Sequence, residues 1–167
     1  MTPRTGPIEL SDVIGGALRR AGKMLAGHLT QVRLEPDMPM LDLDDVLFEQ
    51  VLFNLLDNAA KYSPPGSRID IRSSRDGELV EIEVVDEGSG IPPNDLERIF
   101  DKFYRVQAQD RRRAGTGLGL AICRGFVEAL AGRIIARNRR DRSGAVLTIG
   151  VPVPATAEQR TEAVADG

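Results

Sequence analysis

Two asparagines and a lysine follow one edge of an otherwise apolar segment, and together they could contact a metal-bound polyphosphate. Asn54, Asn58 and Lys61 are spaced four and three residues apart, so on a helix their side chains lie along one line. Residues 48–62 also carry apolar side chains at three- and four-residue spacing, which predicts such a helix. Carboxamide oxygens suit Mg²⁺, and an ammonium group suits phosphate. An ordinary amphipathic helix with a polar border would show the same pattern, so both interpretations remain open at this point.

An acidic residue and two glycines follow a predicted strand and could hold a flat aromatic base. Asp86 stands at the carboxyl end of that strand, and Gly88 and Gly90 follow it at two-residue spacing. A carboxylate there can accept a hydrogen bond from an exocyclic amine such as N6 of adenine. Glycines have no Cβ, so a base can approach the backbone closely. The same residues also suit a plain turn, and this alternative remains open.

A third stretch, residues 115–119, opens a predicted helix and could bind phosphate through its backbone amides. It is not the dinucleotide fingerprint, because the third glycine comes one residue early and no strand precedes it. It is not a P-loop either, because no Lys-Ser or Lys-Thr pair follows. Upstream of it, Arg105 follows several aromatic residues, which favours a docked role for its side chain. The arginines at 111–113 fit an ordinary solvated charge run.

Length and composition restrict the class of protein. The chain has 167 residues, of which 41% are hydrophobic, enough for one packed domain. A net charge of −3 argues against a nucleic-acid surface, and no apolar run approaches the roughly 20 residues that span a bilayer. The single cysteine, Cys123, excludes an intramolecular disulfide and a multi-cysteine zinc site. Its apolar neighbours indicate a buried packing residue. We therefore expect a cytoplasmic domain without nucleic-acid partners.

The order of helices and strands predicts how these residues are positioned. Helices are expected at residues 11–26, capped by Ser11 or Asp12, at 48–62 behind the cap Asp44, at 94–100 and at 117–130. Strands are expected at residues 29–35, 40–43, 68–74, 79–86, 133–138 and 145–151, the last four as two hairpins. These elements predict an α+β fold, a two-layer sandwich with a mixed, mostly antiparallel sheet and helices on one face. We assign residues 1–7 to a tail, 8–154 to one domain and 155–167 to a disordered tail, with a mobile loop at 107–116.

Residues 54–62, 86–92, 99–105 and 115–120 form four motifs that occur in a fixed order. They resemble the N, G1, F and G2 boxes of the ATP-binding catalytic domain of sensor histidine kinases. That domain lies within the wider family of gyrase, Hsp90, histidine kinase and MutL nucleotide-binding domains. The resemblance covers about residues 29–152 and implies a Bergerat-type ATP-binding fold. Residues 118–124 and 36–42 are most similar to the potassium-responsive Kdp sensor kinases, which implies potassium or osmotic signalling.

The resemblance implies a role for each residue that matches a motif. Asn58 would bind Mg²⁺ with Asn54 beside it, while Lys61 would contact the phosphates and Tyr62 the sugar or base. Asp86 would read the adenine amine, in a pocket shaped by Gly88, Gly90 and Ile91. Arg105 would reach the γ-phosphate, so the catalytic set is Asn54, Lys61 and Arg105. The residues that would line the phosphates are Gly115, Thr116, Gly117, Leu118 and Gly119, and a lid would span about residues 93–114.

One departure within the wider family distinguishes the possible reactions. In the ATP-hydrolysing members, and in the anti-sigma serine kinases, a glutamate base stands at the position of Asn54. A neutral amide cannot take a proton from water or from a serine hydroxyl. A histidine acceptor needs no such base, because neutral imidazole already presents a lone pair. The sequence therefore favours a protein-histidine kinase over an ATP-hydrolysing clamp. A non-catalytic ATP-sensing module remains open, because only the addition of a cognate acceptor domain separates it from a kinase.

The phosphoacceptor itself is not evident in the sequence. The family's acceptor is a histidine followed by an acidic residue on a dimerising helix, and the only histidine here, His28, does not fit that pattern. The resemblance thus implies a catalytic fragment whose acceptor histidine lies on another domain of the same protein, with a response regulator downstream. We expect this fragment to be monomeric and cytoplasmic, and the full-length protein to be a dimeric, membrane-anchored sensor.

Overall fold

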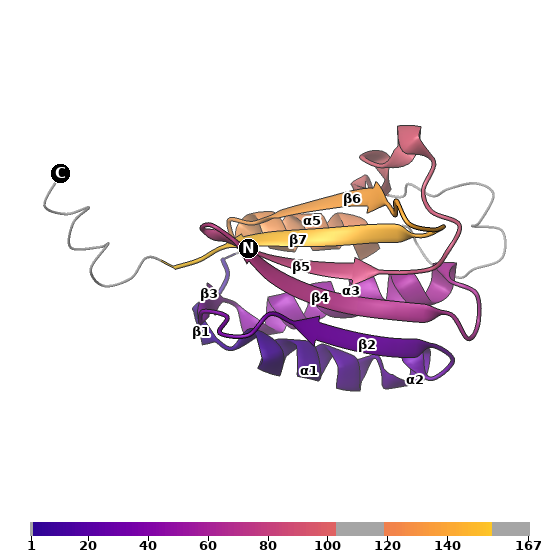
Figure 1. The fold of residues 1–167 in the computed structure, drawn as a ribbon. Coiled ribbons are helices and arrows are strands. Elements are labelled where there is room, and N and C mark those ends of the chain that lie inside the picture. The colour runs from indigo at the N-terminus through magenta and orange to yellow at the C-terminus, as the bar shows by residue number, and fades with distance from the viewer. Residues whose placement is uncertain (1, 103–118, 155–167) are drawn as a thin grey trace, which may run out of the picture.

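The central sheet has five strands in the order β2-β4-β5-β7-β6 (Figure 1). Their bounds are β2 Leu29–Leu34, β4 Arg68–Asp76, β5 Leu79–Val85, β6 Arg133–Asn138 and β7 Ala145–Pro152. β2 pairs parallel with β4, and the other pairs of this sheet are antiparallel. This computed structural model describes residues 2–102 and 119–154.

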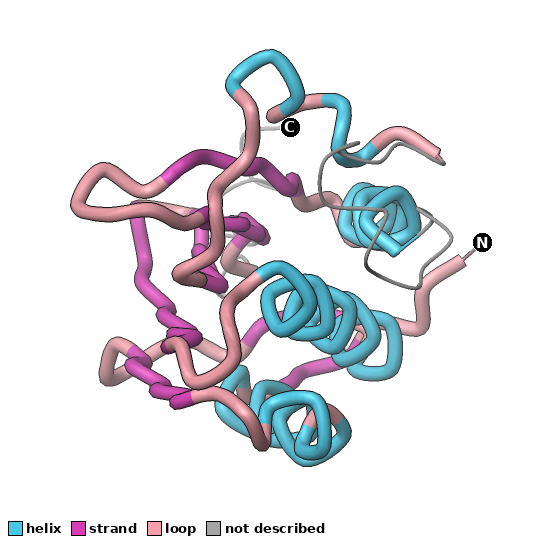
Figure 2. Tube along the Cα trace, turned by 90° about the vertical axis from the view of Figure 1, so that its right-hand side faces the viewer, coloured by secondary structure: helices cyan, strands magenta, loops and turns pink. Residues whose placement is uncertain are grey.

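Helices cover one face of the sheet and leave the other face open (Figure 2). α1 spans Leu10–Arg20, α2 Gly22–Leu25, α3 Asp45–Tyr62 and α5 Gly119–Ala129, and two 3-10 helices, η1 and η2, span Pro93–Asp95 and Arg98–Phe100. Strand residues that alternate toward the helices, such as Ile69 and Ile82, are fully buried. The predicted fold class, a two-layer α+β sandwich with a mostly antiparallel sheet, is confirmed.

α3 is the helix around which the helical layer packs. It contacts α1, α2, α5 and strand β5. Phe48, Val51 and Leu55 on its apolar face are fully buried, as the helical spacing predicts. On α5, the Cys123 thiol is fully buried and donates a hydrogen bond of 3.7 Å to the Val51 carbonyl. The interface between α3 and α5 is therefore a closed part of the core.

Asp44 caps α3 as predicted. Its Oδ1 accepts hydrogen bonds from the backbone N–H groups of Val46 at 3.1 Å and Leu47 at 3.2 Å. Its Oδ2 accepts another from the backbone N–H of Arg4 at 2.8 Å. These donors lower the pKa of the Asp44 carboxyl, and the bond from Arg4 has the largest effect. The cap therefore joins the N-terminal segment to the start of the central helix.

The first helix differs from the prediction of one helix over residues 11–26. Ala21 takes backbone angles of φ −86° and ψ 3°, so α1 ends before it and α2 begins after it. Ser11 and Asp12 do not cap α1, because the helix begins earlier and Glu9 occupies the N-cap position. That cap has no side-chain hydrogen bond, so the buried apolar face holds the start of this helix.

A second, two-stranded sheet was only half predicted. β3, Leu41–Leu43, lies in the strand expected at residues 40–43, but it pairs antiparallel with β1, Gly6–Ile8. β1 begins within the segment expected to be a tail, and its three residues are too few to show a periodic pattern. Pairing with a distant strand forms this element, which no local pattern indicates.

Other predictions are corrected or lie beyond the described residues. The helix expected at residues 94–100 is instead the two short turns η1 and η2. The predicted mobile loop at 107–116 and the tail at 155–167 lie outside the described residues. Within residues 2–102 and 119–154, no helix is long and apolar enough to cross a membrane.

Candidate nucleotide-binding site

The polar edge of α3 faces the start of α5. Asn54 Oδ1 accepts a hydrogen bond of 2.9 Å from Gln50 Nε2, and its Nδ2 donates one of 3.5 Å to the Gly119 carbonyl. Lys61 Nζ forms an ion pair of 2.9 Å with Asp57 Oδ2, one helical turn away. The side chain of the half-buried Asn58 forms no hydrogen bond with another described residue, so its carboxamide is available to a ligand.

Asp86 directly follows β5 and is 5% exposed. Its Oδ1 accepts hydrogen bonds from the backbone N–H groups of Gly88 at 2.9 Å and Ala145 at 3.0 Å. No donor in the described part of the chain is paired with Oδ2. Burial raises the pKa of this carboxyl, although the two N–H donors and the positive charge of Arg139 oppose the rise. The structure thus fixes one carboxylate oxygen and leaves the other for a ligand.

The loop after Asp86 packs against the end of α3. A Cβ on Gly88 would collide with the carbonyl oxygen of Tyr62, the last residue of that helix, so this position requires glycine. Gly90 has φ +80°, in the left-handed region that glycine favours. The last residue of α3 therefore lies against the loop that follows Asp86.

The end of β6 and the turn between β6 and β7 hold the loop that follows Asp86. Asn138 exchanges two hydrogen bonds of 2.7 Å with Ile91, accepting from its N–H and donating to its carbonyl. Arg139 Nη1 donates to the Asp86 carbonyl at 3.0 Å, and Ser143 Oγ donates to the Gly88 carbonyl at 2.6 Å. Ile91, a predicted site residue in this loop, is thus held by hydrogen bonds to a hairpin that is distant in sequence.

These β6–β7 residues were not among the predicted site residues. Residues 137–142 stand out in the sequence only as a short, interrupted basic cluster. One signal was present: Ile134, Ala136 and Asn138 alternate along β6, so an amide occupies a position where a third apolar side chain is expected. A polar residue on the covered face of a sheet requires a hydrogen-bonding partner.

Part of the predicted site lies outside the described residues, namely Arg105, Gly115, Thr116, Gly117 and Leu118. Gly119 is described and is the first residue of α5. A Cβ at Gly119 would have no described neighbour within 4 Å. Contact with the Asn54 side chain is therefore the structural link between this residue and α3.

The described residues fit a metal ion that arrives with a nucleotide. No group of three His, Cys, Asp or Glu side chains in residues 2–102 and 119–154 could hold a metal. Mg²⁺ commonly uses one or two protein oxygens and completes its shell with substrate phosphates and waters. Asn58 could supply such an oxygen, with Asn54 one turn earlier on the same edge of α3. The donor set suits Mg²⁺ bound to a polyphosphate.

Comparison with known proteins gives consistent matches. Residues 43–155 match the family model of the histidine kinase-, DNA gyrase B- and HSP90-like ATPases. The chain is 41% identical over 148 residues to the sensor protein KdpD of Clostridium acetobutylicum, which covers 87% of this chain and 16% of that protein. It is also 41% identical over 129 residues to the sensor histidine kinase WalK of Bacillus subtilis, which covers 75% of this chain and 21% of WalK.

A solved structure supports the same grouping. The mycobacterial sensor histidine kinase MprB superposes with a TM-score of 0.79 at 29% identity, over 90% of this chain and 99% of the MprB chain. The similarity therefore extends over nearly the whole solved chain, whereas the present chain spans less than a quarter of either curated relative.

Proposed function

The chain belongs to the family of histidine kinase-, DNA gyrase B- and HSP90-like ATPases, and we propose that it binds Mg²⁺–ATP and donates the γ-phosphate to a histidine on a separate dimerisation domain. It carries a histidine kinase-type ATPase domain of the kind found in sensor kinases. The observation that carries the proposal is the packing of the end of α3, the helix that bears Asn54 and Asn58, against the loop of the buried Asp86.

Asp86 is suited to recognise adenine. Its Oδ1 is held by two backbone N–H groups, so the direction of Oδ2 is set before a ligand arrives. An ionised carboxylate only accepts hydrogen bonds, so it accepts one from the N6 amine of adenine. The carbonyl oxygen at the same position of guanine offers no such donor. We therefore expect ATP to bind in preference to GTP.

The edge of α3 is suited to the phosphates. Mg²⁺ would be held by Asn58, with Asn54 beside it, and would neutralise charge on the phosphates. Lys61 would contact the same phosphates. Its ion pair with Asp57 is exposed, and an exposed helical pair of this kind contributes only about 0.3–0.5 kcal/mol. A phosphate can therefore replace or share that partner at little cost.

The neutral Asn54 favours histidine as the acceptor. A neutral imidazole nitrogen would attack the γ-phosphorus with its own lone pair, forming the N–P bond. The bond from that phosphorus to the bridging oxygen breaks, and ADP leaves with the electron pair. The Asn54 amide takes no proton in this step. It is hydrogen-bonded to Gln50 and to α5, so it is fixed as a polar contact.

We infer the wider biological role from the same relatives. The match to KdpD and the resemblance at residues 36–42 and 118–124 support a place in potassium or osmotic signalling. The partners would be a phosphoacceptor histidine domain of the same protein and a response regulator. We propose that the full-length protein is a membrane-anchored dimer whose catalytic domain lies in the cytoplasm, and that this fragment alone is a monomer.

Calorimetric titration tests the site. The chain is titrated with ADP and with a non-hydrolysable ATP analogue, each with and without Mg²⁺, and Asn58→Ala is compared with Asp76→Ala, an exposed control at the end of β4. We expect magnesium-dependent binding that Asn58→Ala loses and Asp76→Ala keeps, because Asn58 supplies the protein oxygen for the ion. Binding by Asn58→Ala with full magnesium dependence would exclude this role.

Adding an acceptor domain tests the reaction. We expect phosphate to appear on the histidine of a cognate acceptor domain and hardly any ATP hydrolysis without it. Nucleotide binding without transfer would indicate an ATP-sensing module. Rapid ATP turnover that Asn54→Ala abolishes would instead indicate an ATP-hydrolysing clamp.

A further inference from the structure

Three side chains of one hairpin hold the backbone of the loop that carries Asp86. We name residues 138–144, at the end of β6 and in the turn to β7, the support loop. Its Asn138, Arg139 and Ser143 side chains form four hydrogen bonds of 2.6–3.0 Å with backbone groups of residues 86–91. Residues 47–55 positions apart are thereby joined by side chains, in addition to the pairing of β5 with β7.

Asn138 pairs with a whole peptide unit. Its carboxamide accepts from the N–H of Ile91 and donates to the carbonyl of the same residue, each at 2.7 Å. The backbone of Gly90 lies directly beneath this amide, because a Cβ there would come within 2.8 Å of Asn138 Oδ1. Both the position and the orientation of residue 91 are therefore determined by one side chain.

Arg139 acts on the other end of the same loop. Its side chain is only 10% exposed, and its Nε and Nη2 bind the Asp141 carboxylate at 3.0 and 2.9 Å. This two-point pairing directs the remaining nitrogen, Nη1, to the Asp86 carbonyl at 3.0 Å. The backbone of Gly144 packs against that same carbonyl, leaving no room for a Cβ. The peptide of Asp86 is thus held from the support loop.

We propose that Asn138 and Arg139 are positioning residues that determine base specificity, because they fix the two ends of the loop that aims Asp86 Oδ2 at the base. This inference rests on the proposed function, since it requires Asp86 to read adenine. Neither residue needs to contact the nucleotide. The edge of α3 that is proposed to bind the phosphates lies on another element, and the four hydrogen bonds of the support loop go to residues 86–91 and not to that edge.

The first test compares ADP with GDP. Dissociation constants for both nucleotides are measured with Mg²⁺ on the wild type, on Asn138→Ala and on the exposed control Asp76→Ala. We expect Asn138→Ala to bind ADP about fivefold to tenfold more weakly, with less than about a twofold change for GDP. The ADP preference falls, and it stays at the wild-type value in the control.

The second test uses Arg139 and its neighbour. Arg139→Lys keeps the charge but cannot hold Asp141 at two points while reaching the Asp86 carbonyl. We expect it to lose ADP preference as Arg139→Ala does. Arg140→Ala is the control, because Arg140 is exposed and forms no ion pair or hydrogen bond with the described residues. The Arg139 variants perturb the backbone at Asp86, whereas Asn138→Ala perturbs the backbone at Ile91. If one variant fails to fold, the other therefore remains informative.

The unfolding midpoint without nucleotide is measured for each variant. A variant that loses stability but keeps the wild-type ratio of ADP to GDP affinity would show a purely structural role and overturn the proposal. A wild type that binds neither nucleotide, or binds both equally, would overturn the proposed function instead. The two failures are therefore distinguishable.

Discussion

At the scale of single residues, the burial of Asp86 has a consequence for the stability of the fold. Burial raises its pKa in the folded chain above the ordinary value of about 3.9. A carboxyl whose folded pKa is raised contributes stability below the unfolded pKa and loses that contribution as pH rises through the folded value. At neutral pH the ionised Asp86 is therefore a destabilising group in the empty site.

Replacing Asp86 with asparagine separates the two effects. In Asp86→Asn, Oδ1 can still accept from the N–H groups of Gly88 and Ala145, but an NH₂ group replaces Oδ2. We expect ATP binding to weaken by roughly 1–3 kcal/mol, with loss of the preference over GTP, because a donor then faces the adenine amine. Calorimetry with both nucleotides measures this. Undiminished discrimination would show that Asp86 does not read the base.

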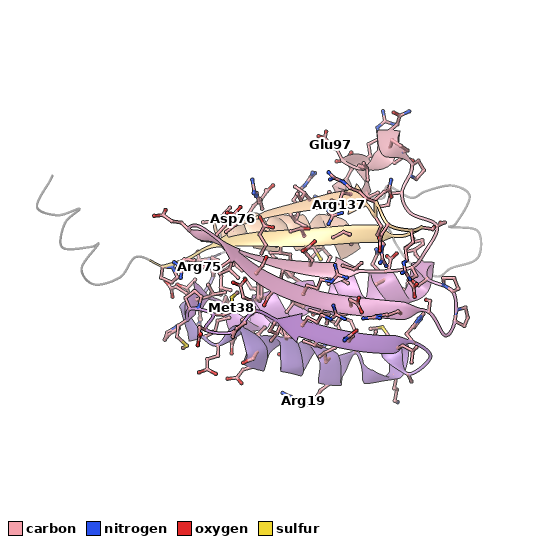
Figure 3. The ribbon with its side chains drawn as sticks, viewed as in Figure 1. Arg19, Met38, Arg75, Asp76, Glu97 and Arg137 are labelled. Atoms are coloured by element: carbon pink, nitrogen blue, oxygen red, sulfur yellow. The ribbon has the colours of Figure 1, made fainter. Side chains whose placement is uncertain are left out.

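The same variant has a stability signature. We expect the free energy of unfolding at neutral pH to stay equal to the wild-type value or exceed it, because the buried charge is gone. The gap between the two proteins should narrow as pH falls toward the ordinary range of aspartate, where the wild-type carboxyl takes up its proton. Urea unfolding at several pH values measures it. Asp76→Asn, at the end of β4 and at the far end of the sheet, is the control (Figure 3).

The residues predicted from the sequence are those whose partners lie close along the chain. Asp86 and Gly88 stand two residues apart, and Asn54 and Asn58 one helical turn apart, so a local pattern shows each pair. Asn138 binds a residue 47 positions away, and no local pattern encodes that distance. Its contribution becomes visible only when the β6–β7 pairing places the hairpin beside the glycine loop.

At the scale of elements, the start of α3 is stabilised by the Asp44 cap in addition to the buried apolar face of the helix. Asp44 satisfies two N–H groups of the first turn and a third from the N-terminal segment. Long, strongly periodic helices such as α3 follow from the sequence, because one apolar stripe repeats over many turns. Short elements such as β1 do not, because three residues without a pattern take their form from the strand they meet.

Removing the cap should destabilise the chain in a pH-dependent way. We expect Asp44→Ala to lower the free energy of unfolding at neutral pH by about 1 kcal/mol, the usual cost of a lost N-cap. The pKa of Asp44 is lowered in the folded chain, so its contribution is present above the unfolded pKa and is lost as pH falls through the folded value. Wild type and variant should therefore converge in acid. Asp42→Ala, at an exposed position on β3, is the control, and equal losses in Asp44→Ala at every pH would contradict this account.

At the scale of the whole molecule, antiparallel pairing gathers the site at one end of the sheet. Val85 pairs with Val146, and Asn138 pairs with Ala145, so the loops that leave β5 and β6 lie side by side. The end of β4, with Arg75 and Asp76, lies at the opposite end of the sheet (Figure 3). The two-layer architecture could be predicted from the alternation of elements, but this convergence depends on strand order, which the sequence does not state.

The rate at which the buried Cys123 thiol is modified can report how often α5 separates from α3. Cys123 is the sole cysteine, it is fully buried, and desolvation raises its pKa to about 12. An alkylating reagent can therefore react only while α5 is detached from α3, and the rate of modification counts those openings. Because α5 also contacts Asn54, Mg²⁺–ADP at a hundred times its dissociation constant should slow the reaction by about a hundredfold, as mass spectrometry over time would record. An unchanged rate would mean that the thiol is exposed by fraying of α5 that leaves the nucleotide in place.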